Sequence, residues 1–136
     1  LGSGGASLTV QAVLRDMGAS EIVVLSRNGD DNYVNMYIKH TDAQIIVNTT
    51  PVGMHPNIDD VPIAQACDMH EDLVVFDAVY NPNETGLLKE AIKADAKPVY
   101  GIKMLLYQGA ESFEIWTGKK APVDVMHDAL IKYLRL

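Results

Sequence analysis

A glycine-rich turn at the start of the chain, Gly2-Ser3-Gly4-Gly5-Ala6-Ser7, has the residue types that bind a pyrophosphate. Glycine at the first position permits a tight turn, and Gly4 lets the backbone approach a phosphate closely. A helix that follows such a turn directs unpaired N–H groups and the positive end of its dipole at the anion. Ser7 stands where the dinucleotide fingerprint has a third glycine. The motif therefore fits a dinucleotide site and also an ordinary glycine turn.

The next polar cluster, Ser26-Arg27-Asn28, follows an apolar run about 20 residues after the glycine turn. An NAD site usually has Asp or Glu here, because a carboxylate accepts hydrogen bonds from ribose hydroxyls. A guanidinium instead pairs with a 2′-phosphate and stacks on adenine. Arg27 therefore favours NADP over NAD, whereas the carboxylates of Asp30 and Asp31 disfavour a nearby phosphate. A turn arginine exposed to solvent without a ligand is the alternative.

Composition argues against several other classes of function. The chain has 136 residues and a net charge of −7, and it contains no Lys/Arg cluster, so we expect no binding to nucleic acid. No apolar run reaches the roughly 18 residues that a membrane-spanning helix needs. The single cysteine, Cys67, excludes an internal disulfide; we expect it to be buried and the protein to be cytoplasmic. The histidines at 40, 55, 70 and 127 lack the spacing of a helical metal site, so no metal ion is expected.

Apolar periodicity predicts the elements that position these residues. Short β-branched runs, typical of buried parallel strands, occur at 22–25, 45–47, 73–76 and 98–100. Helical spacing recurs at 6–17, 87–92, 104–116 and 123–134. Pro62 is suited to the first turn of a short helix reaching Cys67, and residues 29–43 fit either an edge strand or a helical turn.

Strands that alternate with helices predict an α/β fold with a mostly parallel sheet. Such a sheet binds ligands at the carboxyl ends of its strands, where this chain has most of its Gly, Asn, Thr and Pro residues. Only Leu1 precedes the glycine turn, so we expect the sheet to be truncated at its first strand. On this interpretation the chain is a truncated product or the ordered part of a longer polypeptide.

Motifs at successive strand ends together resemble the C-terminal NADP-binding domain of shikimate dehydrogenase. They are Gly2 to Ser7, Asn48-Thr49-Thr50-Pro51-Val52-Gly53-Met54, Asp77-Ala78-Val79-Tyr80-Asn81-Pro82 with Thr85 and Leu87-Leu88, and Gly101 to Ala110 continuing through Phe113 and Trp116-Thr117-Gly118. The resemblance covers essentially the whole chain. It implies a Rossmann-like, doubly wound fold. It also implies reversible, NADPH-dependent reduction of 3-dehydroshikimate to shikimate, in chorismate and aromatic amino-acid biosynthesis.

The resemblance also implies a role for individual residues. The pyrophosphate would lie against Gly2, Ser3, Gly4, Gly5 and Ala6, and the 2′-phosphate against Ser26, Arg27 and Asn28. The path to the nicotinamide would be lined by Asn48, Thr49, Thr50, Ala78, Gly101 and Met104. Tyr80 and Gln108 would contact hydroxyls of the substrate.

The resemblance further implies that the catalytic Lys and Asp, and the Ser pair that holds the substrate carboxylate, belong to an N-terminal domain, which we expect to be absent from this sequence. We therefore expect residues 1–136 to form one NADP-binding domain that is inactive alone and has no catalytic residue of its own. Lys103 and Asp77 are not expected to replace the absent pair. The helix at 123–134 is expected to pack on the absent domain, leaving Tyr133, Leu134 and Leu136 partly exposed, whereas Phe113 and Trp116 are expected to pack in the core.

Three departures from the family pattern affect the choice of cofactor. Ser26 stands where Asn is common, Asp30 and Asp31 stand where a second basic residue often follows, and the segment between Arg27 and Ile45 is short. They leave open an NAD-using quinate/shikimate dehydrogenase domain, and a non-catalytic dinucleotide-binding module is the other alternative. A methyltransferase is disfavoured, because Arg27 replaces the acidic residue that its ribose site prefers.

Overall fold

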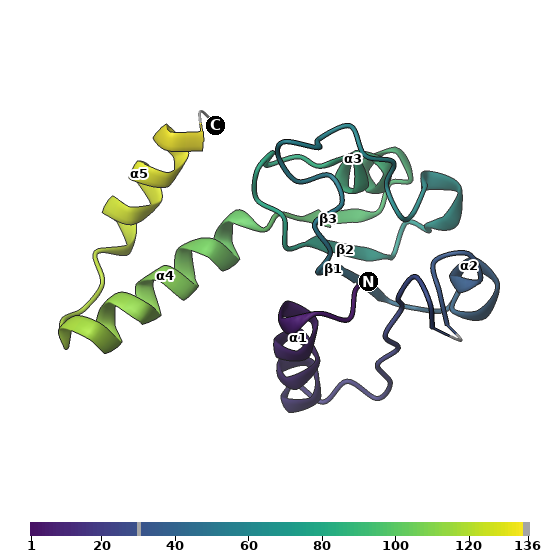
Figure 1. The fold of residues 1–136 in the computed structure, drawn as a ribbon, viewed down its shortest axis with the longest axis horizontal. Helices are drawn as coiled ribbons and strands as arrows, with labels where there is room; N and C mark the ends of the chain where they lie inside the picture. Colours follow the sequence, from purple (N-terminus) through teal and green to yellow (C-terminus); the bar gives the residue numbers. More distant parts are fainter. Residues whose placement is uncertain (30, 135–136) are drawn as a thin grey trace.

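The computed structural model describes residues 1–29 and 31–134, and for Tyr37 only the backbone. In chain order the elements are α1 (Gly5–Asp16), α2 (Met36–Lys39), β1 (Ile45–Asn48), the 3-10 helix η1 (Ala66–Asp68), β2 (Val74–Asp77), α3 (Gly86–Lys93), β3 (Lys97–Val99), α4 (Ile102–Thr117) and α5 (Val123–Leu134). Figure 1 shows the sheet between α3 and α1, with α4 and α5 extending away from it.

The sheet has the order β1-β2-β3, and both pairings are parallel. Ile45 lies opposite Val74, and Val74 lies opposite Lys97. Val75 on the central strand is fully buried and belongs to the same core as Leu88 and Ala91 of α3. This confirms the α/β class, and the apolar runs at 45–47 and 73–76 are strands as predicted. The last of the four predicted strands begins one residue earlier than expected, at Lys97.

The apolar run at 22–25 is not a strand, contrary to the sequence-based expectation. Leu1 and Gly2 lie between this run and β1: the N–H of Gly2 donates to the Leu25 carbonyl (2.9 Å), and the Leu1 carbonyl accepts from the N–H of Thr49 (2.9 Å). A cavity of about 450 Å³ is lined by residues 18–25 on one side and by 41–47 on the other. Residues 22–25 therefore border a cavity instead of pairing with a neighbouring strand.

Two ambiguous segments take helical forms. Residues 29–43 contain the short helix α2 and no strand among the described residues, so the helical alternative is correct. Among the apolar residues of this segment, Met36 is buried, whereas Val34 and Ile38 are each 84% exposed. Between Pro62 and Cys67 the predicted helix is reduced to η1, which begins only at Ala66.

Helix α1 follows the glycine turn as predicted, and Gly18 ends it with a positive φ of 85°. The predicted apolar face is only partly correct, since Ser7 is buried whereas Val13 and Met17 are exposed. Ser7, Val10 and Leu14 line the cavity described above. The side of α1 that faces the protein is therefore rotated from the one that apolar spacing alone indicates.

Helices α4 and α5 pack on each other and project from the sheet (Figure 1). Trp116 is 82% exposed and Phe113 half-buried, so the prediction that both lie in a core is wrong for Trp116. Tyr133 is exposed and Leu134 half-buried, as expected, while Leu136 lies outside the described residues. The described helices include none that is long and apolar enough to cross a membrane.

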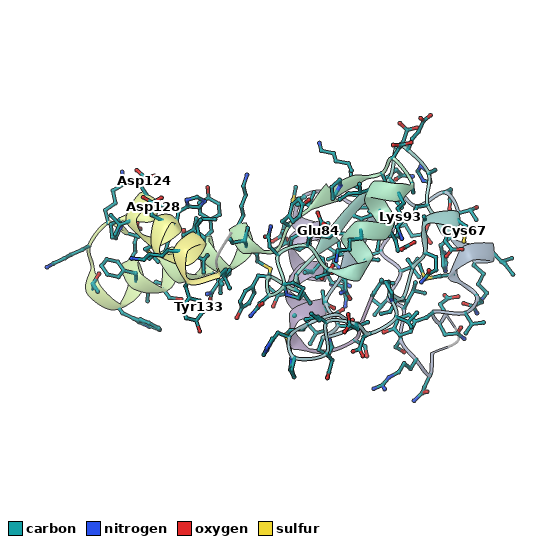
Figure 2. All side chains as sticks on the ribbon, turned by 90° about the horizontal axis from the view of Figure 1, so that it is seen from above. Cys67, Glu84, Lys93, Asp124, Asp128 and Tyr133 are labelled. Carbon is teal, nitrogen blue, oxygen red and sulfur yellow. The ribbon has the colours of Figure 1, made fainter. Side chains whose placement is uncertain are left out.

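Cys67 is exposed, which corrects the expectation that it is a small buried apolar residue. Figure 2 shows it at the opposite end of the molecule from Tyr133, Asp124 and Asp128 of α5. Its burial was inferred from residue type alone, and the 3-10 helix that carries it turns this side chain to solvent.

Candidate functional site

The glycine turn bends the backbone tightly just before α1. Gly2 adopts a φ of 99°, and a Cβ there would lie 2.8 Å from Oγ1 of Thr49, so a larger residue is excluded. At Gly4 and Gly5 a Cβ would meet no described atom within 4 Å. Helix α1 begins at Gly5 without a side-chain cap from Gly4, and the first N–H groups of a helix lack partners inside it. The turn therefore offers backbone donors toward open space.

The end of β1 is joined to this turn by Thr49. Its Oγ1 donates to the Leu1 carbonyl at 2.7 Å, and its N–H donates to the same oxygen. Thr50 donates from its N–H (3.0 Å) and from Oγ1 (2.7 Å) to Oδ1 of Asn48. The Asn48-Thr49-Thr50 segment is thus held beside the glycine turn by specific hydrogen bonds.

Asp77, at the end of β2, is fully buried and links three segments of the chain. Its Oδ1 accepts from Nδ2 of Asn48 (2.9 Å) and from the N–H of Val79 (3.0 Å), and its Oδ2 accepts from Oγ1 of Thr85 (2.6 Å). Thr85 is the N-cap of α3 and accepts from the N–H of Leu88. Burial raises the pKa of Asp77 despite these hydrogen bonds. The carboxyl group therefore organises the strand ends and is not available to a substrate.

Gly101 brings the start of α4 against the end of β2. A Cβ on it would lie 2.6 Å from the carbonyl oxygen of Asp77 and 2.7 Å from those of Ala78 and Val79. Only glycine permits this approach, which places Ala78 and Gly101, two of the six residues of the predicted nicotinamide path, side by side. Met104, one turn further along α4, is 40% exposed at the same end of the helix.

The two predicted substrate ligands, Tyr80 and Gln108, lie on the segments that meet at Gly101. Both are exposed, and Nε2 of Gln108 donates to the Leu105 carbonyl within α4 (3.1 Å). Lys103 is exposed on α4, whereas Asp77 is buried. The described residues contain no group of three or more His, Cys, Asp or Glu side chains that could hold a metal ion.

The loop after residues 22–25 carries the predicted 2′-phosphate ligands. Arg27 and Asn28 are exposed, and Ser26 is half-buried and pairs through its backbone with Asn32. The loop is attached to the glycine turn by the hydrogen bond between Gly2 and Leu25. Asp30 lies outside the described residues.

Sequence analysis did not identify the ion pair that closes this loop. Nζ of Lys39 lies 2.7 Å from Oδ1 of Asp31, and Nε2 of His40 lies 3.5 Å from the same oxygen. The hydrogen bond from Lys39 is the main cause of a lowered pKa of Asp31. The two partners are eight residues apart, outside the spacing of any regular element, so no sequence pattern points to the pair.

Comparison with known proteins identifies relatives of this chain. A family model described as the shikimate 5'-dehydrogenase C-terminal domain matches residues 101–131. The chain is 51% identical over 155 residues to the shikimate dehydrogenase (NADP(+)) of Methanobrevibacter smithii, in a match that covers 99% of this chain and 55% of that protein. It is 43% identical over 158 residues to the enzyme of the same name from Methanopyrus kandleri, with 99% and 54% coverage.

The fold is similar to a crystal structure of shikimate 5-dehydrogenase from Thermus thermophilus in complex with NADP(H) and shikimate. The TM-score is 0.81 at 30% identity, over 96% of this chain and 52% of that one. The chain spans about half the length of the curated relatives it matches. From its motifs, its Rossmann-like fold and these similarities, the chain belongs to the shikimate dehydrogenase family, in which it corresponds to the C-terminal domain.

Proposed function

We propose that this chain is the NADP-binding domain of an NADP-dependent shikimate dehydrogenase, which reversibly reduces 3-dehydroshikimate to shikimate. The observation that carries the proposal is the convergence of three predicted sites at one edge of the sheet. Backbone hydrogen bonds from Gly2 to Leu25 and from Thr49 to Leu1 join the glycine turn to the Arg27 loop and to the end of β1. The names of the curated relatives, which specify NADP(+), support the choice of cofactor.

The glycine turn fits a dinucleotide because it leaves space for the pyrophosphate. With no Cβ at Gly4 or Gly5, the pyrophosphate can approach the N–H groups that begin α1. Arg27, exposed on the adjoining loop, supplies a guanidinium for the 2′-phosphate. Asn48 to Thr50, Ala78, Gly101 and Met104 would border the nicotinamide, and NADPH bound there would supply a hydride to the substrate carbonyl.

The chain's own residues would bind and orient the nucleotide, but they would not complete the reaction. Reduction of a ketone needs an acid close to the carbonyl oxygen. In our proposal neither Lys103 nor Asp77, which is buried within its own hydrogen bonds, serves this purpose. In our proposal residues 1–136 form one nucleotide-binding domain, and a second domain supplies the acid and most of the substrate contacts.

A parallel titration with NADPH and NADH at low salt tests cofactor binding. We expect NADPH to be preferred, and Arg27→Gln to weaken NADPH binding by about 10- to 100-fold, since a hydrogen-bonded charge pair is lost. NADH binding is expected to change less than about twofold, because it lacks the 2′-phosphate. Arg15→Gln, the same change at an exposed residue near the end of α1, is the matched control. Equal or NADH-favoured binding would support the NAD-using alternative, and no binding of either would contradict the proposal.

A second substitution tests whether Gln108 contacts the substrate. In a protein that joins this chain to a substrate domain, Gln108→Ala is expected to raise the KM for shikimate about tenfold through loss of a hydrogen bond, while sparing NADPH affinity. Steady-state kinetics and nucleotide titration measure the two effects separately. Gln44→Ala, at an exposed glutamine before β1, serves as control. Equal loss of both affinities, or no effect on KM, counts against the assignment and favours a non-catalytic dinucleotide-binding module.

A further inference from the structure

Asp31 lies in the loop that we propose to hold the 2′-phosphate. Ser26 pairs with Asn32 through the backbone. A Cβ on Gly29 would lie 2.9 Å from the Asp31 carbonyl oxygen and 3.1 Å from Oγ of Ser26. The loop therefore folds back on itself, so that Asp31 and Arg27 belong to one tight turn. A carboxylate that faced the nucleotide from this turn would repel a 2′-phosphate and would accept hydrogen bonds from the ribose of NADH.

In the structure the Asp31 carboxylate instead contacts residues at the end of α2. Oδ1 of Asp31 is held by Nζ of Lys39 at 2.7 Å, and Nε2 of His40 approaches the same oxygen to 3.5 Å. Both partners come from the end of α2, a different element from the Arg27 loop. The hydrogen bond from Lys39 lowers the pKa of Asp31, because it stabilises the ionised carboxylate. The carboxylate thus faces α2, and its charge is compensated there.

We propose that Lys39 is a specificity-determining residue that acts through Asp31: it holds and neutralises the carboxylate, and so allows the Arg27 loop to accept a 2′-phosphate. The inference rests on the proposed function. With Lys39 in place, Arg27, Asp31 and Lys39 together carry a charge of +1; without it they carry zero, and Asp31 is free to turn toward the nucleotide. Charges within a Debye length of about 8 Å interact appreciably even when exposed.

A double-mutant cycle on the complete protein tests this role at low ionic strength. Lys39→Met is expected to lower the preference for NADPH over NADH by about three- to tenfold, mainly through weaker NADPH binding. Asp31→Asn should leave NADPH affinity at least as high as in the unchanged protein. In the Asp31→Asn background, Lys39→Met should change NADPH affinity by about twofold or less, because the carboxylate it would release is gone. Lys39→Arg, which keeps the cation, should retain the preference.

Matched variants make each outcome decisive. Lys120→Met, in the exposed connection between α4 and α5, makes the same change in net charge far from the loop and should leave the preference unchanged. An equal loss from Lys39→Met with and without Asp31 would overturn the inference, since Lys39 would then act on the phosphate directly. An unchanged preference in Lys39→Met would overturn it as well, while NADPH binding by the parent protein would leave the proposed function standing. Failure of the parent protein to bind either nucleotide would contradict both the inference about Lys39 and the proposed function.

Discussion

Replacement of Asp77 by alanine is expected to lower the free energy of unfolding by about 3–5 kcal/mol. The substitution removes the acceptor of three buried hydrogen bonds, from Asn48, Val79 and Thr85, and leaves those donors without partners in the core. Thr85 would also lose the contact that orients it as the N-cap of α3. Chemical denaturation followed by circular dichroism measures the change.

Asp72→Ala is the matched control for this prediction, because it removes the same side chain from an exposed turn just before β2. We expect it to change the free energy of unfolding by no more than about 0.5 kcal/mol. Similar losses from the two substitutions would contradict the role assigned to Asp77. Nucleotide titration of Asp77→Asn provides a second readout, since disturbance of Asn48 would be transmitted to the Asn48-Thr49-Thr50 segment.

The raised pKa of Asp77 is also expected to make the free energy of unfolding depend on pH. Burial raises the pKa of the folded-state carboxyl, and its hydrogen bonds to Thr85, Val79 and Asn48 oppose this only in part. Above the ordinary aspartate pKa of about 3.9, the folded state then binds more protons at this site than the unfolded state does. The free energy of unfolding is therefore expected to fall as the pH rises from about 4 toward the folded-state pKa. Asp77→Asn should reduce this slope; the same slope in the variant would show that other groups cause it.

Gly101→Ala is expected to cost about 3 kcal/mol or more of the free energy of unfolding. The added methyl group would lie 2.6–2.7 Å from three backbone carbonyl oxygens, which cannot move aside as a flexible side chain can. Relief of the clash would shift α4 away from the end of β2, and Met104 and Gln108 would shift with it. Loss of stability should therefore be accompanied by weaker NADPH binding in whatever fraction remains folded.

Gly109→Ala, in the same helix, tests the reason for the effect. A Cβ there would lie 3.5 Å from Cε of Met126, an ordinary contact. Alanine favours a helix interior over glycine by roughly 0.5–1 kcal/mol, so this variant is expected to be more stable than the parent. Thermal unfolding of the two variants should show opposite shifts in Tm. A loss at Gly109 as large as that at Gly101 would indicate that α4 tolerates no substitution, and would remove the specific role of Gly101.

Local chemistry accounts for the features of the fold that depend on short stretches of sequence. Thr85 caps α3 and Gly18 ends α1, because an N-cap oxygen and a positive φ are properties of single residues and their immediate neighbours. The runs at 45–47 and 73–76 are parallel strands, because continuous apolar sequence suits a strand covered on both faces. The strand-end motifs at Gly2, Asn48, Asp77 and Gly101 could also be located, since parallel strands bring their carboxyl ends to one edge.

Burial was predicted less well, because it depends on which surfaces meet. The run at 22–25 has the composition of a strand, but a strand also needs a neighbour to pair with, and here a cavity lies in that place. Trp116 and Val13 have core-like spacing yet are exposed, because α4 projects from the sheet and α1 turns another side toward the protein.

The sequence by itself determined the α/β class, the positions of β1, β2 and β3 along the chain to within a residue or two, and the residue types at each strand end, because these depend on short-range patterns. Only the tertiary structure revealed that Asp77 joins Asn48 to Thr85 and that Lys39 pairs with Asp31. Both links connect residues eight or more positions apart, through side-chain directions that no local periodicity encodes. In our proposal cofactor preference depends on the pair between Lys39 and Asp31, because this pair compensates the Asp31 charge that would otherwise repel a bound 2′-phosphate.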